Sequence, residues 1–401
     1  MAIENRTRLL AVDIAAVVGL ALWLTIDHFS KPLFGQAGWP ASAVDYIIIY
    51  HDSHLIVSTH SYPQYFPYPP PAVVLLAATA LFSLKVSAAI WLAVVGGAVA
   101  VSYWCLARIL ELRFGSGLMP VLLLAQLAGA YAIQWDMRSL NTNLVVLAAV
   151  LLGILSLVRG REIAAGCWVA FAVALKIIPV LLIVYFVWTR RYKAFASAIL
   201  ATIVLWVIAP FAVFGTGVVD VYRSWFGEVM RAAAPDIGGH AILISFWKAV
   251  GFTGRTDANA ATAIVVVVLA CWIVLGALAA IGALKAGPDR SRQALLADVA
   301  ILVLGPAALS TYLEPYHVVA LIVPAAVVAR NLLDRSIDIA RRFGAVLALL
   351  VATVSLPFSS FEMRGLTVNG AVLVLCWAAF LLAPRSVPRD LGGMASASQR
   401  A

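Results

Sequence analysis

Ionisable residues that could do chemistry are few in this sequence, and the first group lies in segment 28–70. Asp45 and His51 stand there among apolar residues. Asp45 could be a functional carboxylate or equally a solvated loop acid, and its position alone does not decide between them. A zinc site is an alternative, and its ligands would be His51, Asp52, His54 and His60. The spacing of these side chains defines no tetrahedral arrangement.

A second polar group lies in the stretch QWDMRSLNTN, residues 134–143. Asp136, Arg138, Asn141 and Asn143 stand there between two apolar runs. Charged and amide side chains at such a boundary could contact a polar substrate. Asn141 and Asn143 could equally cap the helix that follows, and both interpretations stay open at this point.

A third group combines Lys176 with residues near position 315. Lys176 is a lone cation inside VALKIIPVLL, where a charge is costly and needs a counter-ion. A lipid phosphate would supply one, and an ion pair with Asp136 or Glu314 is the structural alternative. Glu314 and His317 lie three residues apart at a turn, and Pro315 between them disfavours a regular helix. Both could also be ordinary turn residues.

The elements that must position these residues are membrane helices. Of 401 residues, 63% are hydrophobic and 12% charged, whereas soluble domains carry about 25% charged residues. This composition excludes a soluble globule and predicts an all-α polytopic membrane protein. About twelve spans are expected, near 9–27, 86–108, 117–131, 141–158, 163–175, 177–189, 194–214, 259–284, 295–312, 316–331, 343–358 and 367–384.

Several segments depart from a simple crossing. Residues 71–84 are apolar but short, which predicts a re-entrant or interfacial helix. The short spans 163–175 and 177–189 predict a shallow hairpin with Lys176 at its tip. Residues 44–57 mix apolar and polar side chains in a pattern typical of a helix on the membrane surface.

Basic residues define an orientation, because short cytoplasmic loops collect Lys and Arg. The clusters fall at positions 6–8, 108–113, 159–161, 190–193, 285–292, 330–342 and 385–400. We therefore place these loops in the cytoplasm. The large loops 28–70 and 215–258 and the small turns 132–140, 312–316 and 359–366 are expected on the external side. Residues 1–385 form one membrane domain, and 386–401 are expected to be a disordered cytoplasmic tail.

Nearly every ionisable residue at membrane depth falls on the external side. A transport path would be expected to leave polar groups in both halves of the bilayer, so this asymmetry favours a one-sided enzyme. A lipid-linked sugar flippase or a small-solute transporter is the alternative, and internal repeats would favour it. The two halves of the chain show no convincing repeat.

The sequence resembles glycosyltransferase family 87, the polyprenol-phosphate-mannose-dependent mannosyltransferases of the glycosyltransferase C superfamily. The resemblance covers most of the chain. It depends on Asp45 in the first external loop, on Tyr68 followed by two prolines, and on the order of RGRE (159–162), ALKIIP (174–179) and TRRYK (189–193). Where the family usually has Gly-Gln-x-Asn, this chain reads Leu-Asn-Thr-Asn at 140–143, which keeps the two amides.

The resemblance implies an inverting transfer of a sugar, most simply mannose, from a polyprenyl-phosphate donor to a hydroxyl of a lipid or glycan acceptor. Asp45 would be the catalytic base. Lys176, helped by His317 or Arg138, would hold the donor phosphate. Substrate contacts are further expected from Glu314, Asn141, Asn143, Tyr68 and His51.

The expected setting is the bacterial inner membrane, with the active site facing the periplasm or cell exterior. The partners are the donor, the acceptor and the lipid bilayer, with no nucleic acid. No cofactor is expected, and no Asp-x-Asp motif for a metal-bound diphosphate occurs in the sequence. A transferase for arabinose or another sugar on the same carrier remains an alternative.

Overall fold

The computed structural model describes residues 43–63, 66, 68–112, 117–232, 258–308, 315–334, 336–358 and 364–384. These residues form helices joined by short turns, with no strand among them. The expected span 9–27, Glu314 and the expected tail 386–401 lie outside the described residues.

Most of the described helices are joined by short turns. Their bounds are α3 Val44–Thr59, α4 Pro70–Ala77, α5 Leu84–Ile109, α6 Leu118–Ser139, α7 Asn143–Val158, α8 Glu162–Leu175, α9 Leu181–Trp188, α10 Tyr192–Ile203, α11 Ala209–Phe214, α12 Val218–Ala232, α14 Ala258–Ala286, α15 Arg292–Ala308, α16 Ile322–Leu332, α17 Ile339–Phe358 and α18 Arg364–Leu382. Short 3₁₀ segments include η2 Ala78–Leu81, η3 Ile178–Val180 and the seven-residue η7 Pro315–Leu321.

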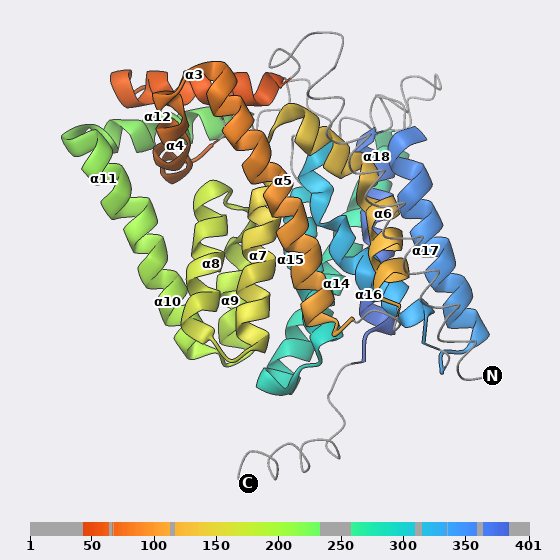
Figure 1. Cartoon of the computed structure of the whole chain (residues 1–401). Helices are drawn as coiled ribbons and strands as arrows, with labels where there is room; N and C mark the ends of the chain where they lie inside the picture. The colour runs from red at the N-terminus through yellow and green to blue at the C-terminus, as the bar shows by residue number, and fades with distance from the viewer. Residues whose placement is uncertain are drawn as a thin grey trace.

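Two helices lie across one end of the bundle formed by the others. Figure 1 shows α3 and α12 at the top, nearly perpendicular to α5 and α7. The turns that join α7 to α8 and α9 to α10 lie at the opposite end. We call these the α3 end and the Arg161 end. The surface helix expected at 44–57 is therefore present as α3, two residues longer than expected.

Within the described ranges, four segments are long and apolar enough to cross a membrane, judged by length and composition: Leu84–Ile109, Leu118–Ser139, Tyr192–Val229 and Val267–Asp289. Within the third, Gly215 has a φ of 56° and a ψ of −133°, and the chain turns there from α11 into α12. Five further apolar helices are shorter. The protein is thus an all-helical polytopic chain, and the expected count of about twelve spans stays a prediction.

The short segments behave as their lengths predict. α4 and η2 together cover residues 70–81, too few to cross a bilayer, and α4 packs against α3. The hairpin α8–α9 breaks at Lys176, whose extended backbone (φ −149°, ψ 134°) ends α8. The break therefore places the lysine between two helices instead of inside one.

One expected turn is helical, and one expected loop contains a helix. The predicted turn at 132–140 is helical through Ser139, because Ile133, Asp136 and Met137 continue the buried face of α6 beyond the apolar run. The predicted loop 215–258 contains α12, an amphipathic helix. Alternating apolar and charged residues lowered the hydropathy of both segments without preventing a helix.

A π-helical turn over Val204–Ile208 joins α10 to α11. Pro210 follows it, and proline has no N–H for the carbonyl four residues earlier, that of Trp206. The Tyr222 hydroxyl of α12 donates to this Trp206 carbonyl. The Trp206 carbonyl oxygen thus accepts a hydrogen bond from α12, the helix that crosses the α3 end.

The Arg161 end carries a buried ion pair as well as exposed cations. Arg290 forms a two-pronged pair with Asp298, and the Tyr185 hydroxyl donates to Asp298 Oδ2 at 2.8 Å. Both charged side chains are at most 5% exposed. Asp298 is therefore a paired structural acid that joins α9 and α15.

Helices α8 and α10 approach most closely at Gly166. A Cβ added there would overlap Ser197 Oγ and the Ala194 carbonyl, and would lie 2.7 Å from the Ala198 nitrogen. Two of these three neighbours are backbone atoms, which cannot rotate away. Only glycine fits at this position.

We expect Gly166→Ala to destabilise the protein by about 1–3 kcal/mol, because the added methyl group must separate α8 from α10. Gly97→Ala on α5 is the matched control. Nothing lies within 4 Å of its added Cβ, so alanine should be neutral or stabilising there by up to about 1 kcal/mol. Thermal unfolding in detergent measures both, and equal midpoints would contradict the close contact.

Candidate active site

Three residues from different parts of the chain meet at the α3 end. Asn141 follows α6, and its Nδ2 donates to Asp45 Oδ2 at 2.8 Å. The Tyr68 hydroxyl donates to Asn141 Oδ1 at 3.0 Å. Tyr68 and Asn141 are buried and Asp45 is partly exposed. Asn141 thus holds a carboxylate that keeps access to the surface.

The turn at Leu140 determines where Asn141 points. Leu140 adopts a left-handed conformation (φ 50°, ψ 46°), which costs a non-glycine residue about 1–2 kcal/mol. Its side chain is fully buried, and Trp91 Nε1 donates to its carbonyl at 2.8 Å. The Asn141 N–H donates a hydrogen bond to the Asp136 carbonyl at 3.0 Å. Packing and these two hydrogen bonds stabilise the strained turn beside Asp45.

A second chain of hydrogen bonds starts at Asp136, in the last turn of α6. Asn143 Nδ2 donates to Asp136 Oδ1 at 2.7 Å, and the Leu144 N–H donates to Asp136 Oδ2 at 3.1 Å. Lys176 Nζ then donates to Asn143 Oδ1 at 2.6 Å. Asp136 is completely buried. Because its carboxylate accepts from Asn143 Nδ2, the amide oxygen of Asn143 is directed toward Lys176.

The two chains are joined. Asn143 Nδ2 also contacts Asn141 Oδ1, at 3.0 Å. Lys176 Nζ lies 5.7 Å from the centre of the Tyr68 ring, and its charge interacts with the carboxylates of Asp136 and Asp45. One cation therefore faces two carboxylates. We call this group, Asp45, Tyr68, Asp136, Asn141, Asn143 and Lys176, the carboxylate–lysine network.

His317 lies next to this network. It stands in η7, where Val318 departs from helical geometry, as expected beside Pro315. A cavity of about 20 Å³ is lined by Asn143, Lys176 and His317 together with apolar side chains. Such a volume holds about one water molecule, so a bound phosphate at this place requires a lining side chain to move.

Two of the expected site residues have their contacts elsewhere. Arg138 is exposed, and its guanidinium lies 5.7 Å from the centre of the Trp135 ring. His51 is exposed on α3 and packs edge-on against Tyr50, with ring centroids 5.2 Å apart. Neither contact belongs to the carboxylate–lysine network.

The alternative metal site on α3 gains no support. Among the described residues, which include all four side chains considered for zinc, no three His, Cys, Asp or Glu side chains group as metal ligands. Burial instead raises the pKa of the Asp52 carboxyl above its ordinary value, and the charge of His51 partly opposes this.

The structure modifies two alternatives from the sequence analysis: helix capping by the asparagines and an ion pair of Lys176 with Asp136. The N-cap residue of α7 is Thr142, and Asn143 is the first residue of the helix. The Asp136 carboxylate of α6 accepts the N–H of Leu144, in the first turn of α7. Asn143 stands between Lys176 and Asp136 and bonds to both. The sequence predicted Asp136 as a boundary residue and as a counter-ion of Lys176, but not as the group that orients Asn143, and it gave no indication of Trp91. The signal for Asp136 was its burial near a lone lysine, which sequence alone does not reveal.

Comparison with known proteins gives one result that bears on this site. The family model described as Glycosyltransferase family 87 matches residues 66–310, which is more than half of the chain. Neither the curated proteins nor the solved structures give a match. The matched segment contains Tyr68, both amides and Lys176. The chain therefore belongs to glycosyltransferase family 87 and is a membrane glycosyltransferase.

Proposed function

We propose that the protein transfers mannose from a polyprenyl-phosphate donor to a hydroxyl group of a lipid or glycan acceptor, with inversion at the anomeric carbon. The observation that supports it is the carboxylate–lysine network, which joins a partly exposed carboxylate to a cation through two asparagines. A base for the acceptor and a cation for the leaving phosphate are the two groups that such a displacement needs.

In the proposed reaction, the acceptor oxygen attacks the anomeric carbon and gives its proton to the Asp45 carboxylate. The bond between that carbon and the phosphate oxygen breaks, and its electron pair leaves with the polyprenyl phosphate. Lys176 stabilises the negative charge that develops there, with His317 beside it. The phosphate needs little protonation to leave, so one carboxylate is enough.

The proposed setting is the inner membrane of a bacterium, with about twelve crossings and the α3 end facing the periplasm or exterior. Polar residues of the network gather at that end, and short turns rich in arginine lie at the other, as the charge distribution of membrane proteins favours. A lipid-borne donor then reaches Lys176 from the bilayer, and the acceptor reaches Asp45 from the surface.

The decisive experiment incubates purified protein with radiolabelled polyprenyl-phosphate-mannose and total membrane lipid. A labelled product with the opposite anomeric configuration is the expected result. Transfer only from a polyprenyl-phosphate arabinose would overturn the choice of sugar. Transfer only from a nucleotide sugar would overturn the donor class, and donor movement across vesicles without product would favour a flippase.

Asn141→Ala should lower kcat by about 10²-fold without changing donor affinity, because Asp45 loses the amide that orients it. Tyr68→Phe removes only the hydroxyl behind Asn141 and leaves the bond between Asn141 and Asp45 in place, so its effect should be smaller. Initial rates over a range of donor concentrations separate kcat from KM. A larger loss from Tyr68→Phe would mean that Asn141 does not position the carboxylate.

A further inference from the structure

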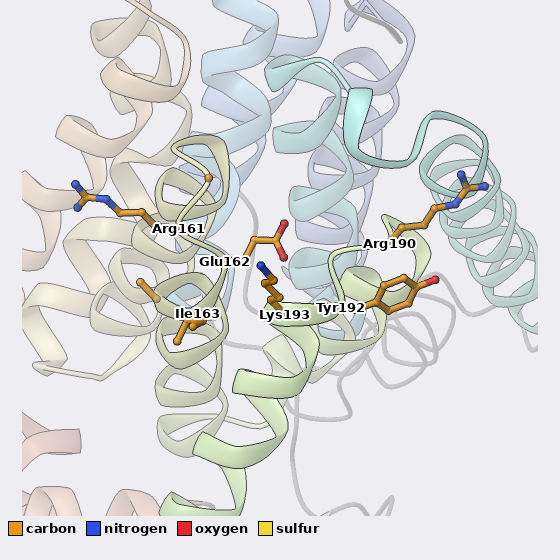
Figure 2. Close-up of a pocket in the computed structure, with 8 residues that line it drawn as sticks. Arg161, Glu162, Ile163, Arg190, Tyr192 and Lys193 are labelled. Atoms are coloured by element: carbon orange, nitrogen blue, oxygen red, sulfur yellow. The ribbon is translucent and has the colours of Figure 1, made fainter. Parts of the chain in front are cut away.

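A large open cavity lies at the Arg161 end, away from the carboxylate–lysine network. Its volume is about 790 Å³, within the range of ligand sites. Figure 2 shows Glu162 and Lys193 in its middle, whereas the side chains of Arg161 and Arg190 extend away from each other on opposite sides, the latter near Tyr192. Its lining comes from the turn before α8, the turn before α10 and the first residues of both helices: Gly160, Arg161, Glu162, Ile163, Ala164, Arg190, Tyr192 and Lys193.

The cavity carries an uncompensated positive charge. Arg161, Arg190 and Lys193 are exposed, and within the described part of the chain none of them pairs with a carboxylate. Glu162 is already neutralised by Arg191, whose Nη1 lies 3.1 Å from Glu162 Oε1. Three free cations around one cavity favour a ligand with one or more negative charges.

The same cavity has an apolar side. Ile163 and Tyr192 are 64% and 62% exposed on its wall. Exposed apolar residues continue from them along the outer faces of the helices, with Cys167 one turn after Ile163 on α8 and Leu200 eight residues after Tyr192 on α10. A soluble anion would gain nothing from this surface, whereas acyl chains would cover it.

The floor of the cavity is closed one turn further in. Gly166 of α8 contacts the backbone of α10 there, which leaves no room for a ligand between the two helices at that level. A charged headgroup can therefore enter between the two turns, while the hydrocarbon chains stay outside the helix pair. Basic pockets of this kind between membrane helices are suited to acidic lipid headgroups.

We propose that this cavity binds anionic phospholipid, with phosphate groups at the rim cations Arg161, Arg190 and Lys193 and acyl chains along α8 and α10. The site lies in the membrane leaflet opposite the proposed transfer site. It does not depend on which sugar or donor the protein uses, because no residue of the carboxylate–lysine network lines it.

The test measures lipid retention by the full-length protein. Wild type and the triple variant Arg161→Gln, Arg190→Gln, Lys193→Gln are placed in nanodiscs of mixed phosphatidylglycerol and phosphatidylcholine. Native mass spectrometry then counts the lipids that remain bound after release. The control variant Arg108→Gln, Lys285→Gln, Arg330→Gln removes the same charge from helix ends outside the cavity. Thermal unfolding confirms that each variant is folded.

We expect wild type and the control to retain phosphatidylglycerol preferentially, and the triple variant to lose this preference by about tenfold or more. Equal retention by the triple variant, or an equal loss in the control, would overturn the site. Addition of glycerol phosphate or inorganic phosphate provides a second arm. Displacement of the lipid by either soluble anion at millimolar concentration would overturn the choice of a lipid ligand.

Discussion

Asp45→Asn should lower the rate of sugar transfer by about 10²–10⁴-fold, the contribution typical of a general base. The amide keeps the size of the carboxylate, and its oxygen can still accept the hydrogen bond that Asn141 Nδ2 donates to position 45. The variant should therefore fold and insert normally while it loses the proton acceptor. Transfer of labelled sugar, measured with purified enzyme at saturating donor, gives the rate.

The control for this prediction is Asp52→Asn, two turns later on α3. Asp52 is a partly buried acid of the same helix that has no bond to the carboxylate–lysine network. Its loss should leave transfer close to the wild-type rate. If Asp45→Asn also kept a near wild-type rate, another group would have to accept the proton, and the proposed base would be wrong.

Lys176→Met should weaken binding of the donor by roughly 2–5 kcal/mol, the cost typical of removing one partner from a partly buried charged contact. Methionine keeps the apolar stem of the lysine but removes the cation that faces Asn143, Asp136 and Asp45. Two carboxylates then repel the incoming phosphate without compensation. Equilibrium binding of a polyprenyl-phosphate analogue measures the loss directly.

Lys85→Met provides the comparison, because Lys85 is an exposed lysine in the first turn of α5, at the α3 end of the bundle. It should change analogue binding little, since surface charges contribute weakly. An unchanged affinity together with an unchanged kcat in Lys176→Met would show that the phosphate binds elsewhere. A fall in kcat with unchanged affinity would place the lysine in the transition state alone.

Much of the local structure follows from the sequence. The composition predicts the helical bundle, the mixed pattern at 44–57 predicts α3, and the single charge at Lys176 predicts the break between α8 and α9. These features depend on residues close together in the chain. The loss of periodicity near Pro315 likewise predicts the irregular backbone before α16.

The tertiary arrangement of the site could not be read in the same way. Asp136 was assigned to a loop because Gln134, Asp136 and Arg138 interrupt the apolar run, yet the helix continues and buries Asp136 against α7. The hydrogen bond from Asn141 to Asp45 joins residues 96 positions apart. No local pattern encodes such a contact.

The length of α8 has a consequence for the surrounding bilayer. Its 14 residues rise about 21 Å from Glu162 to the break at Lys176, whereas a hydrocarbon core is about 30 Å thick. With Glu162 at one headgroup layer, Lys176 lies roughly 9 Å below the opposite layer. A lipid phosphate bound there sinks beneath its neighbours or the membrane becomes thinner around it. For the proposed lipid-borne donor, the free energy of binding should therefore depend on bilayer thickness through hydrophobic mismatch.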